Sequence, residues 1–458
     1  MSYLVTSYLL FAASVILASS LMAAEPLPLS KDYWKDEAFL KSFNGSYRVN
    51  ARIEPTVTTE ERGLLVSIQP MMAAGKREEA LAKLTSSELI KSSAAIAFNA
   101  GNIQFELQNL EDAEKHYTEA LNILPSFRRA HRNLGFVFAR QENWEKALPA
   151  LEQAIGLGDQ DAATLGQFAY GRMHQEQYVS ALQAFRLARL TQPDVIEWKA
   201  GAAQCLGHLK RDEEALALLE EVIKARPNDT SYYLLQASLF ISLDRQDDAI
   251  ANLDLVRRLG QLDTENHLLL ANLHLRAGSS QLARPVMMEA LAMEKKAPFT
   301  TVINVLEFTT MTRDWVLARD FAQGIEKAYP DISNDKLEHK QTYLSAIIDI
   351  DSGENPARGA EALEQLIDQD PLDGLSLILL ARYRAGEQRY QEAGMLLEQA
   401  GRVEGHEYQS RVELAKIFVA TKRYTDAVNE LDQALEMRPG KVIRDYRDAV
   451  VLLAAAAE

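Results

Sequence analysis

The chain has 458 residues, of which 47% are hydrophobic and 25% charged, so it can fill about three average domains or one elongated repeat array and is not disordered along its whole length. Its 49 lysines and arginines against 65 aspartates and glutamates give a formal net charge of −16, and no long basic run offsets it, which makes nucleic acid an unfavourable partner. The only cysteine, Cys205, excludes an intramolecular disulfide and a CxxC metal site.

Residues 1–24 have the pattern of a secretory signal peptide. The stretch LVTSYLLFAASVILASSLMAA (4–24) carries no charge and ends in small residues, which predicts cleavage near Ala23 or Ala24. Because these 21 residues also suffice to span a bilayer, the alternative is an uncleaved inner-membrane anchor. No cysteine lies at the cleavage point, so lipid anchoring is excluded. We therefore expect a periplasmic or exported protein that meets a membrane only through an uncleaved N-terminus.

Residues 25–60 lie outside the repeat that follows them. Within this extension KDEAFLKSF (35–43) is expected to form a short helix, and SYRVNARIEP (46–55) alternates like an extended strand or arm. The pattern leaves open whether the extension folds back on the first repeat or reaches for a partner.

A period of 34 residues runs through most of the chain, and a period of this length decides the fold. Small residues recur at this spacing, with few irregular steps, at Ala80, Ala113, Ala147, Ala181, Ala215, Ala249, Ala283, Ala318, Gly359, Ala393 and Ala427. The step of 41 from Ala318 to Gly359 is the only large irregularity.

Three further columns keep the same phase. Four residues after the small residue comes a bulky one, as at Tyr117, Leu151, Phe185, Leu219, Leu253 and Met287. Twelve residues before it comes another small one, as at Gly101, Gly135, Ala169, Ala203, Ala237 and Ala271. Twelve residues after it comes Pro125, Pro193, Pro227, Pro330, Pro371 or Pro439. The small residues let two antiparallel helices touch, the bulky residue fills the groove beside them, and proline ends the second helix.

These columns resemble the tetratricopeptide repeat, a 34-residue helix-turn-helix unit. The resemblance implies an all-α fold, a right-handed α-solenoid of about eleven units. Units 1–8 would occupy residues 61–330 and units 9–11 residues 340–439, with an irregular spacer at 331–339 between them. Residues 440–458 are expected to form a capping helix, because a terminal repeat has no neighbour to cover its exposed face.

The sequence departs from the family pattern at several points. The first-helix tryptophan of the family is missing, and units eight and nine place Leu306 and Ile347 where a small residue is expected. These two large side chains and the spacer beside them predict looser packing and a bend.

No sequence motif supports catalysis. None of the eight histidines lies in an HExxH motif or beside a nucleophile motif, and His267 and His274 occupy packing positions. The stretch LGDQDAAT (157–164) lacks the remaining oxygen ligands and the glycine of a calcium loop. Cys205 lies in the middle of a first helix with no catalytic partner. We therefore predict a protein that is not an enzyme and holds no cofactor or metal.

The candidate binding site lies on the face that the first helices line, where such scaffolds carry their function. Its basic centre is the segment PSFRRAHRNLG (125–135). The candidate residues combine guanidinium, amide and aromatic groups: Phe98, Asn102, Phe105, Arg129, Arg132, Asn133, Arg140, Gln167 and Tyr170. This set suits an extended peptide with a carboxylate or an acidic side chain. The alternative is a solvated arginine-rich helix start that pairs with nearby carboxylates.

Some tetratricopeptide-repeat proteins clamp a C-terminal carboxylate with basic and asparagine side chains. Asn102 and Asn133 fit that pattern, whereas Phe98, Ala163 and Gln167 stand where basic residues are expected. A clamp of that type is therefore not predicted.

A second resemblance covers the stretch from Phe98 to Trp198. Its segments SFRRAHRNLG (126–135) and LGDQDAATLG (157–166) are similar to exported bacterial tetratricopeptide-repeat proteins that accompany the TonB, ExbB and ExbD energy-transduction system. The resemblance implies a periplasmic accessory that scaffolds an envelope complex, with TonB, ExbB or ExbD as partners.

Two other functions stay open at this stage. One is an adaptor for outer-membrane assembly or secretion, which would bind strand-forming clients. The other is a docking regulator of a cell-wall enzyme. An enzyme proper is the least favoured, because nothing in the sequence meets the geometric requirements of a catalytic site.

Overall fold

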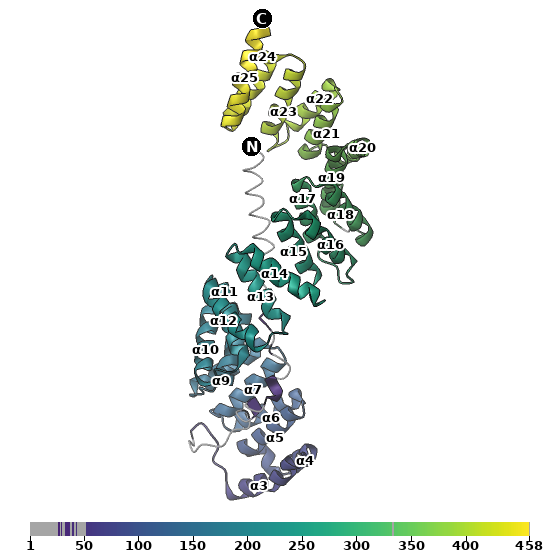
Figure 1. Ribbon diagram of the computed structural model, residues 1–458. Helices are drawn as coiled ribbons and strands as arrows, with labels where there is room; N and C mark the ends of the chain where they lie inside the picture. Colours follow the sequence, from purple (N-terminus) through teal and green to yellow (C-terminus); the bar gives the residue numbers. More distant parts are fainter. Residues whose placement is uncertain are drawn as a thin grey trace. The chain divides into compact units, whose positions relative to one another are not determined.

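The computed structural model describes residues 26, 27, 29, 33–36, 39, 40, 43, 52–331 and 334–457. All regular secondary structure in these ranges is helical (Figure 1). None of the described helices is long and apolar enough to cross a membrane. The predicted signal peptide or anchor at 1–24 lies outside the described residues.

The chain divides into two compact units, with the boundary between Asn252 and Leu253 inside helix α14. The helices of the first unit are η1 (Tyr33–Lys35), α3 (Thr59–Ala73), α4 (Arg77–Thr85), η2 (Glu88–Lys91), α5 (Ala94–Glu106), α6 (Leu110–Ile123), α7 (Arg128–Arg140), α8 (Trp144–Gly156), α9 (Ala162–His174), α10 (Tyr178–Thr191), α11 (Ile196–His208), α12 (Asp212–Ala225) and α13 (Thr230–Ser242).

Helix α14 (Gln246–Arg258) crosses the boundary. The second unit continues with α15 (Thr264–Arg276), α16 (Ser280–Ala292), α17 (Phe299–Thr312), α18 (Trp315–Ala328), α19 (Asp335–Ser352), α20 (Pro356–Gln369), α21 (Gly374–Gly386), α22 (Tyr390–Ala400), α23 (Glu407–Ala420), α24 (Tyr424–Met437) and α25 (Lys441–Ala457).

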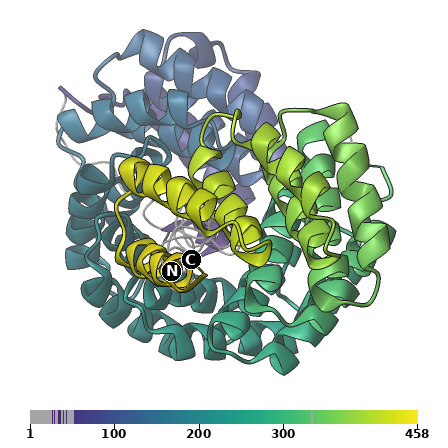
Figure 2. The ribbon, with the colours of Figure 1, turned by 90° about the horizontal axis from the view of Figure 1, so that it is seen from above.

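Consecutive helices from α3 to α24 form eleven pairs, and α25 packs on α24 as the predicted terminal helix. Figures 1 and 2 show consecutive helices of each unit lying side by side. Within the first unit the first helices of neighbouring pairs, α5, α7, α9 and α11, also contact one another. They therefore line a common inner face. The predicted all-α solenoid of helix-turn-helix units is confirmed.

The small and bulky columns explain how each pair closes. A Cβ atom on Gly101 of α5 would lie 2.7 Å from the ring of Tyr117 on α6, and one on Gly135 of α7 would lie 2.6 Å from Leu151 on α8. Only glycine leaves room for these side chains, because the packed interior has no spare volume. The column alanines of the second helices, such as Ala147, are fully buried.

In the repeats that have a proline twelve residues after the small residue, this proline sets the end of the second helix. Helices α6, α10 and α12 end two residues before Pro125, Pro193 and Pro227. The residue before a proline is driven out of the helical region, and the proline itself donates no hydrogen bond.

The turn within each pair contains one residue with positive φ. Eight of these residues are not glycine, with φ between 57° and 65°: Gln108, Glu142, Glu176, Lys210, Asp244, Arg313, Gln388 and Lys422. Gly75, Gly278 and Gly353 fill the same place in the remaining pairs. The side chains of the non-glycine residues give no sign of this conformation, so the column was not visible in the sequence.

The region around Leu306 packs in part as predicted. Leu306 is fully buried in α17, and α17 and α18 contact each other less than α15 and α16 do. The prediction is wrong for the ninth pair, because α19 and α20 are closely packed. Gly359 of α20 lies against the backbone of Ala346 rather than against Ile347.

The spacer prediction also needs correction. Helix α19 begins at Asp335, so residues 335–339 of the expected irregular spacer (331–339) are helical. Asn334 caps the helix by accepting hydrogen bonds from the N–H groups of Lys336 and Leu337.

Candidate functional site

The inner face of the first unit holds the N-terminal segment, by which we mean the described residues between Pro26 and Glu54. The N–H of Leu27 donates to Gln204 Oε1 of α11 over 2.9 Å. Arg132 Nη2 of α7 donates to the carbonyl of Phe43 over 3.2 Å. The extension therefore folds back, and it crosses the first helices in the order opposite to the repeats.

Three aromatic side chains anchor the segment. Tyr33, Phe39 and Phe43 are 7%, 3% and 0% exposed. The ring of Phe43 stacks on Phe105 of α5 at a centroid distance of 4.4 Å, and Phe39 lies 5.6 Å from Phe136 of α7. Aromatic pairs at these separations add to the free energy gained from burial.

Tyr33 rests on Trp198 of α11, with ring centroids 5.4 Å apart. A Cβ atom on Gly166 of α9 would lie 2.3 Å from the Trp198 ring, so glycine is needed to seat the indole. Burial raises the pKa of Tyr33 well above its usual value, and the nearby Gln167 side chain only partly opposes this. The Tyr33 hydroxyl therefore stays protonated at neutral pH.

The other end of the segment is held by charge and by the backbone. Glu54 is 3% exposed, and its Oε1 lies 3.3 Å from Arg128 Nη2. Burial raises the pKa of Glu54 despite the opposing charges of Arg129, Arg128 and Arg132. The N–H of Arg128 also donates to the carbonyl of Ile53 over 3.1 Å.

The structure corrects the local conformation expected for the extension. Residues Arg52, Ile53 and Glu54 form a turn and bend, so the described part of the predicted strand (46–55) is not a strand. The described residues Phe39, Leu40 and Phe43 are helical, as expected for 35–43.

The nine candidate residues divide into two groups and one rim residue, Arg140. In the first group Phe105 and Arg132 contact Phe43 directly, and Gln167 lowers the pKa of Tyr33. Arg129 acts on the Glu54 carboxylate through its charge, and Tyr170 is 6.2 Å from the Trp198 ring under Tyr33.

The residues of the second group contact side chains within and between the helices. Phe98 packs at 4.8 Å on Phe127 between helices, and the guanidinium of Arg129 lies over the Phe98 ring. Asn102 accepts hydrogen bonds from the Tyr117 hydroxyl over 2.8 Å and from Asn133 Nδ2 over 2.9 Å. These three candidates are buried among neighbouring side chains, and their part in binding a ligand stays a prediction.

Arg140 is the one candidate with a partly exposed side chain. Its guanidinium lies 5.2 Å from the centre of the Phe105 ring, and burial lowers its pKa. It therefore marks the accessible rim of the face that the N-terminal segment covers.

Sequence reasoning missed the residues that form most of this contact. Tyr33, Phe39 and Phe43 lie outside the repeat, and Phe136 and Trp198 are not among the nine candidate residues. The signal was present in DYWKDEAFLKSF (32–43), which carries four aromatic side chains. A short segment this aromatic needs a surface to cover, because large apolar side chains are seldom left in water.

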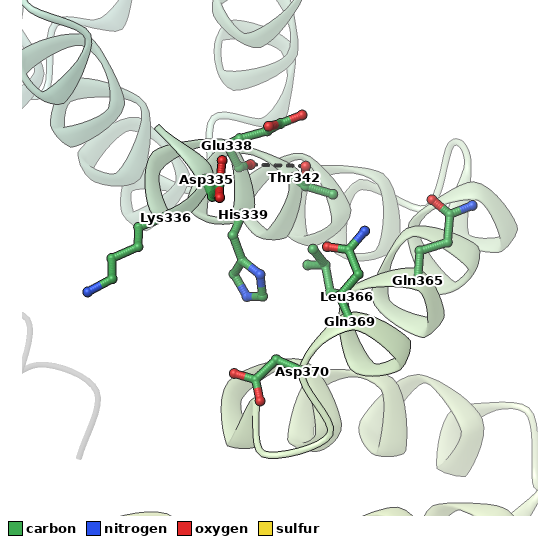
Figure 3. Close-up of a pocket in the computed structure, with 9 residues that line it drawn as sticks. All are labelled: Asp335, Lys336, Glu338, His339, Thr342, Gln365, Leu366, Gln369 and Asp370. Atoms are coloured by element: carbon green, nitrogen blue, oxygen red, sulfur yellow. Dashed lines mark hydrogen bonds between the residues drawn. The ribbon is translucent and has the colours of Figure 1, made fainter. Parts of the chain in front are cut away.

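The second unit has a separate hollow of about 610 Å³ (Figure 3). It is lined mostly by polar residues of α19 and α20 and the turn after α20: Asp335, Lys336, Glu338, His339, Thr342, Gln365, Leu366, Gln369 and Asp370. His339 Nε2 shares a hydrogen bond of 2.8 Å with Asp373 Oδ2. Burial alone would raise the pKa of Asp373, but hydrogen bonds from Ser376 and His339 outweigh it and lower the pKa.

Within the described ranges no three His, Cys, Asp or Glu side chains come together in a way that could hold a metal ion. Cys205 is fully buried in α11, and burial raises the pKa of its thiol to about 12. A thiol with this pKa is protonated at neutral pH and is a poor nucleophile.

Three parts of the chain match family models described as tetratricopeptide repeat. One model matches residues 172–239, and a second matches residues 98–162 and 350–407. The first two segments lie in the unit that holds the N-terminal segment, and the third lies in the other unit. No curated protein matches the chain.

Several solved structures are similar to parts of the chain. A tetratricopeptide repeat protein from Parabacteroides merdae is 17% identical, covers 55% of this chain and 98% of its own, and has a TM-score of 0.36. YrrB, described as a TPR protein with an unusual peptide-binding site, is 20% identical, covers 43% and 97%, and also scores 0.36. The pilF protein of Pseudomonas aeruginosa is 16% identical, covers 54% and 96%, and scores 0.33.

Proposed function

We propose that this chain, a tetratricopeptide-repeat protein, is a non-enzymatic scaffold of the bacterial cell envelope that binds a peptide segment of another protein on the inner face of its first helices. Tetratricopeptide-repeat proteins are generally protein-interaction scaffolds. Their stacked helix pairs build an extended concave surface.

One observation carries the proposal. The face formed by α5, α7, α9 and α11 already holds a polypeptide segment from outside the repeat, through aromatic side chains and hydrogen bonds to backbone groups. Hydrogen bonds to the backbone do not depend on the ligand's sequence, whereas the aromatic contacts select it. This combination is what a peptide-binding groove needs.

The place of action in the cell is part of the proposal. The uncharged stretch 4–24 supports export to the periplasm, with an inner-membrane anchor if it is not cleaved. Pro26 and Leu27, which follow the expected cleavage point, belong to the docked segment. Cleavage near Ala24 would therefore leave the groove contacts intact.

The finer assignment is an accessory of the TonB, ExbB and ExbD system. It is supported by the similarity of SFRRAHRNLG (126–135) and LGDQDAATLG (157–166) to such accessories. Both segments lie at the covered face: the first contains Arg132, which holds Phe43, and the second ends at Gly166, which seats Trp198.

Alanine substitution of the basic residues would change stability as well as binding, so it does not test this function by itself. Arg129 and Arg132 are 5% and 6% exposed, so their removal would leave cavities and a poorly compensated Glu54. A better probe is a photo-crosslinking amino acid at Arg140, on the rim of the groove. Leu190 of α10, which is 78% exposed, is the matched control position.

Both variants carry a C-terminal tag and are crosslinked in the native envelope, and the products are identified by mass spectrometry. We expect TonB, ExbB or ExbD homologues on position 140 and none on position 190. Barrel proteins or cell-wall enzymes on position 140 would replace the TonB assignment with one of the other adaptor functions. Specific products on position 190 alone would contradict the groove itself. Mass spectrometry of the purified chain also gives its first residue, near Glu25 if the signal is cleaved.

A further inference from the structure

We infer that the N-terminal segment is an intramolecular ligand of the groove, and that the partner is a peptide with aromatic side chains and a carboxylate that must displace it. This inference rests on the proposed function, because it specifies what binds at the same face. Tyr33, Phe39, Phe43 and Glu54 define the pattern that the partner would reproduce.

The contacts of the segment are separate from those that hold the repeats together. Each helix pair closes through its own columns, for example Gly101 against Tyr117 and Gly135 against Leu151. The segment adds aromatic side chains to the inner face after those contacts are made. Its release therefore exposes Phe105, Phe136 and Trp198 without breaking a helix pair.

The segment also covers the groove unevenly. Tyr33 is buried, while Lys35 and Asp36 beside it are exposed and Trp34 is half-buried. A few anchor side chains carry most of the binding energy of such a contact, so a competitor that supplies the same anchors can replace it.

The chemistry of the face selects the partner. Phe105, Phe136 and Trp198 offer aromatic surface along α5, α7 and α11. Arg128 and Arg129 lie at one end and act on the carboxylate of Glu54. A peptide with aromatic residues at one end and an acidic residue at the other meets both requirements, in a chain whose own net charge is −16.

Covalent attachment gives the segment an advantage over any free peptide. A tethered ligand acts at an effective concentration of the order of millimolar. The intact chain should therefore bind an added copy of the segment at least about tenfold more weakly than a chain whose own segment is impaired.

The test uses the full chain and a fluorescent synthetic peptide with the sequence of residues 26–54. Three proteins are compared by fluorescence anisotropy: wild type, the double variant Phe39→Ala/Phe43→Ala, and Lys35→Ala as a control on an exposed position. We expect the double variant to bind the peptide at least about tenfold more tightly than wild type, and Lys35→Ala to behave as wild type. A peptide with the same two phenylalanines replaced by alanine should not bind any of the three.

Equal binding by wild type and the double variant would overturn the inference, as would no binding by a double variant with a wild-type thermal melt. If the double variant does not fold, hydrogen exchange of wild type with excess peptide replaces it. Exchange of the chain's own segment must then rise, and unchanged exchange overturns the inference. The envelope crosslinks at Arg140 test the proposed function separately, because they do not depend on the added peptide.

Discussion

The pairs α9–α10 and α21–α22 are built from the same columns, yet the faces beside them differ. Ten residues of α11, next to α9, are buried, and Trp198 among them lies under Tyr33 of the N-terminal segment. Only four residues of α23, next to α21, are buried. A hollow of about 340 Å³, lined in part by Arg382, Glu413 and Lys416, lies beside α21 and α23.

The repeat therefore sets how the helices pack, but it does not determine whether their inner face is covered. Ala181 and Ala393, at equivalent column positions, are both fully buried. What distinguishes the two regions is a segment from outside the repeat. Among the described residues, the same scaffold therefore carries a covered face in one unit and a hollow beside α21 and α23 in the other.

The substitution that should destabilise the chain most lies under the N-terminal segment. Gly166→Val would place its side chain in the Trp198 ring and should lower the free energy of unfolding by about 3 kcal/mol. Urea denaturation measures the change. Gly394→Ala in α22 is the matched control, since no atom lies within 4 Å of a Cβ there. Gly394→Ala should raise the free energy of unfolding by about 0.5–1 kcal/mol. A loss as large as that of Gly166→Val would mean that the two glycines do not differ in the space around them.

A second substitution should loosen the segment alone. Tyr33→Ala removes the ring that covers Trp198 and should lower the free energy of local opening at the start of α11 by about 2 kcal/mol. Hydrogen exchange measured by mass spectrometry detects this opening. Exchange in α21 and α23 should not change, and Lys35→Ala should have no effect. Uniform acceleration through both units would mean that Tyr33 supports the whole fold.

A third pair of substitutions tests the part of the scaffold that both regions share. Glu176 and Lys422 have φ of 58° and 60° in the turns after α9 and α23. Glycine adopts this conformation without steric cost, so Glu176→Gly and Lys422→Gly should each raise stability by up to about 1 kcal/mol. Thermal melts should show similar gains for the two. A loss of stability at either site would show that the original side chain stabilises the fold by more than the left-handed backbone conformation destabilises it.

The smallest effect concerns pH. The imidazole of His208 stacks on Tyr178 at 4.0 Å, and burial, aided by the charge of Lys210, lowers its pKa. The unfolded chain therefore binds more protons near this group's usual pKa of 6.5, so stability should fall as the pH drops below that value. His208→Gln should reduce this fall between pH 7 and pH 5.5 in urea titrations. An unchanged pH dependence would mean that the imidazole remains solvated.

Most of the fold follows from short-range patterns. The small and bulky columns fix which residues of a helix pair meet, as Gly135 and Leu151 do, and Pro125 fixes where α6 ends. Ile347 misled the prediction because the turn after α19 is one residue longer: Gly353 lies six residues before Gly359, whereas Gln108 lies five before Ala113, so Ala346 meets Gly359 instead. A longer turn shifts which residue of the first helix packs, and the columns alone do not reveal it.

The site was less predictable for a different reason. Repeat positions show which face a side chain points to, but not whether another segment covers that face. Arg132 and Phe105 were therefore found, while their role in holding Phe43 was not. Asn102, at a predicted groove position, also lies within reach of Tyr117 on the second helix and accepts its hydrogen bond.

The left-handed turn residues recur every 34 residues from Gln108 to Asp244, which makes the helix pairs interchangeable as modules. Joining the chain at two successive turn residues would delete one whole pair and leave the turn backbone unchanged. The N-terminal segment limits this freedom, because it must reach from Gln204 on α11 to Phe105 on α5. Helix pairs can be gained or lost elsewhere in the chain. The number of pairs between α5 and α11, however, is tied to the length of the N-terminal segment.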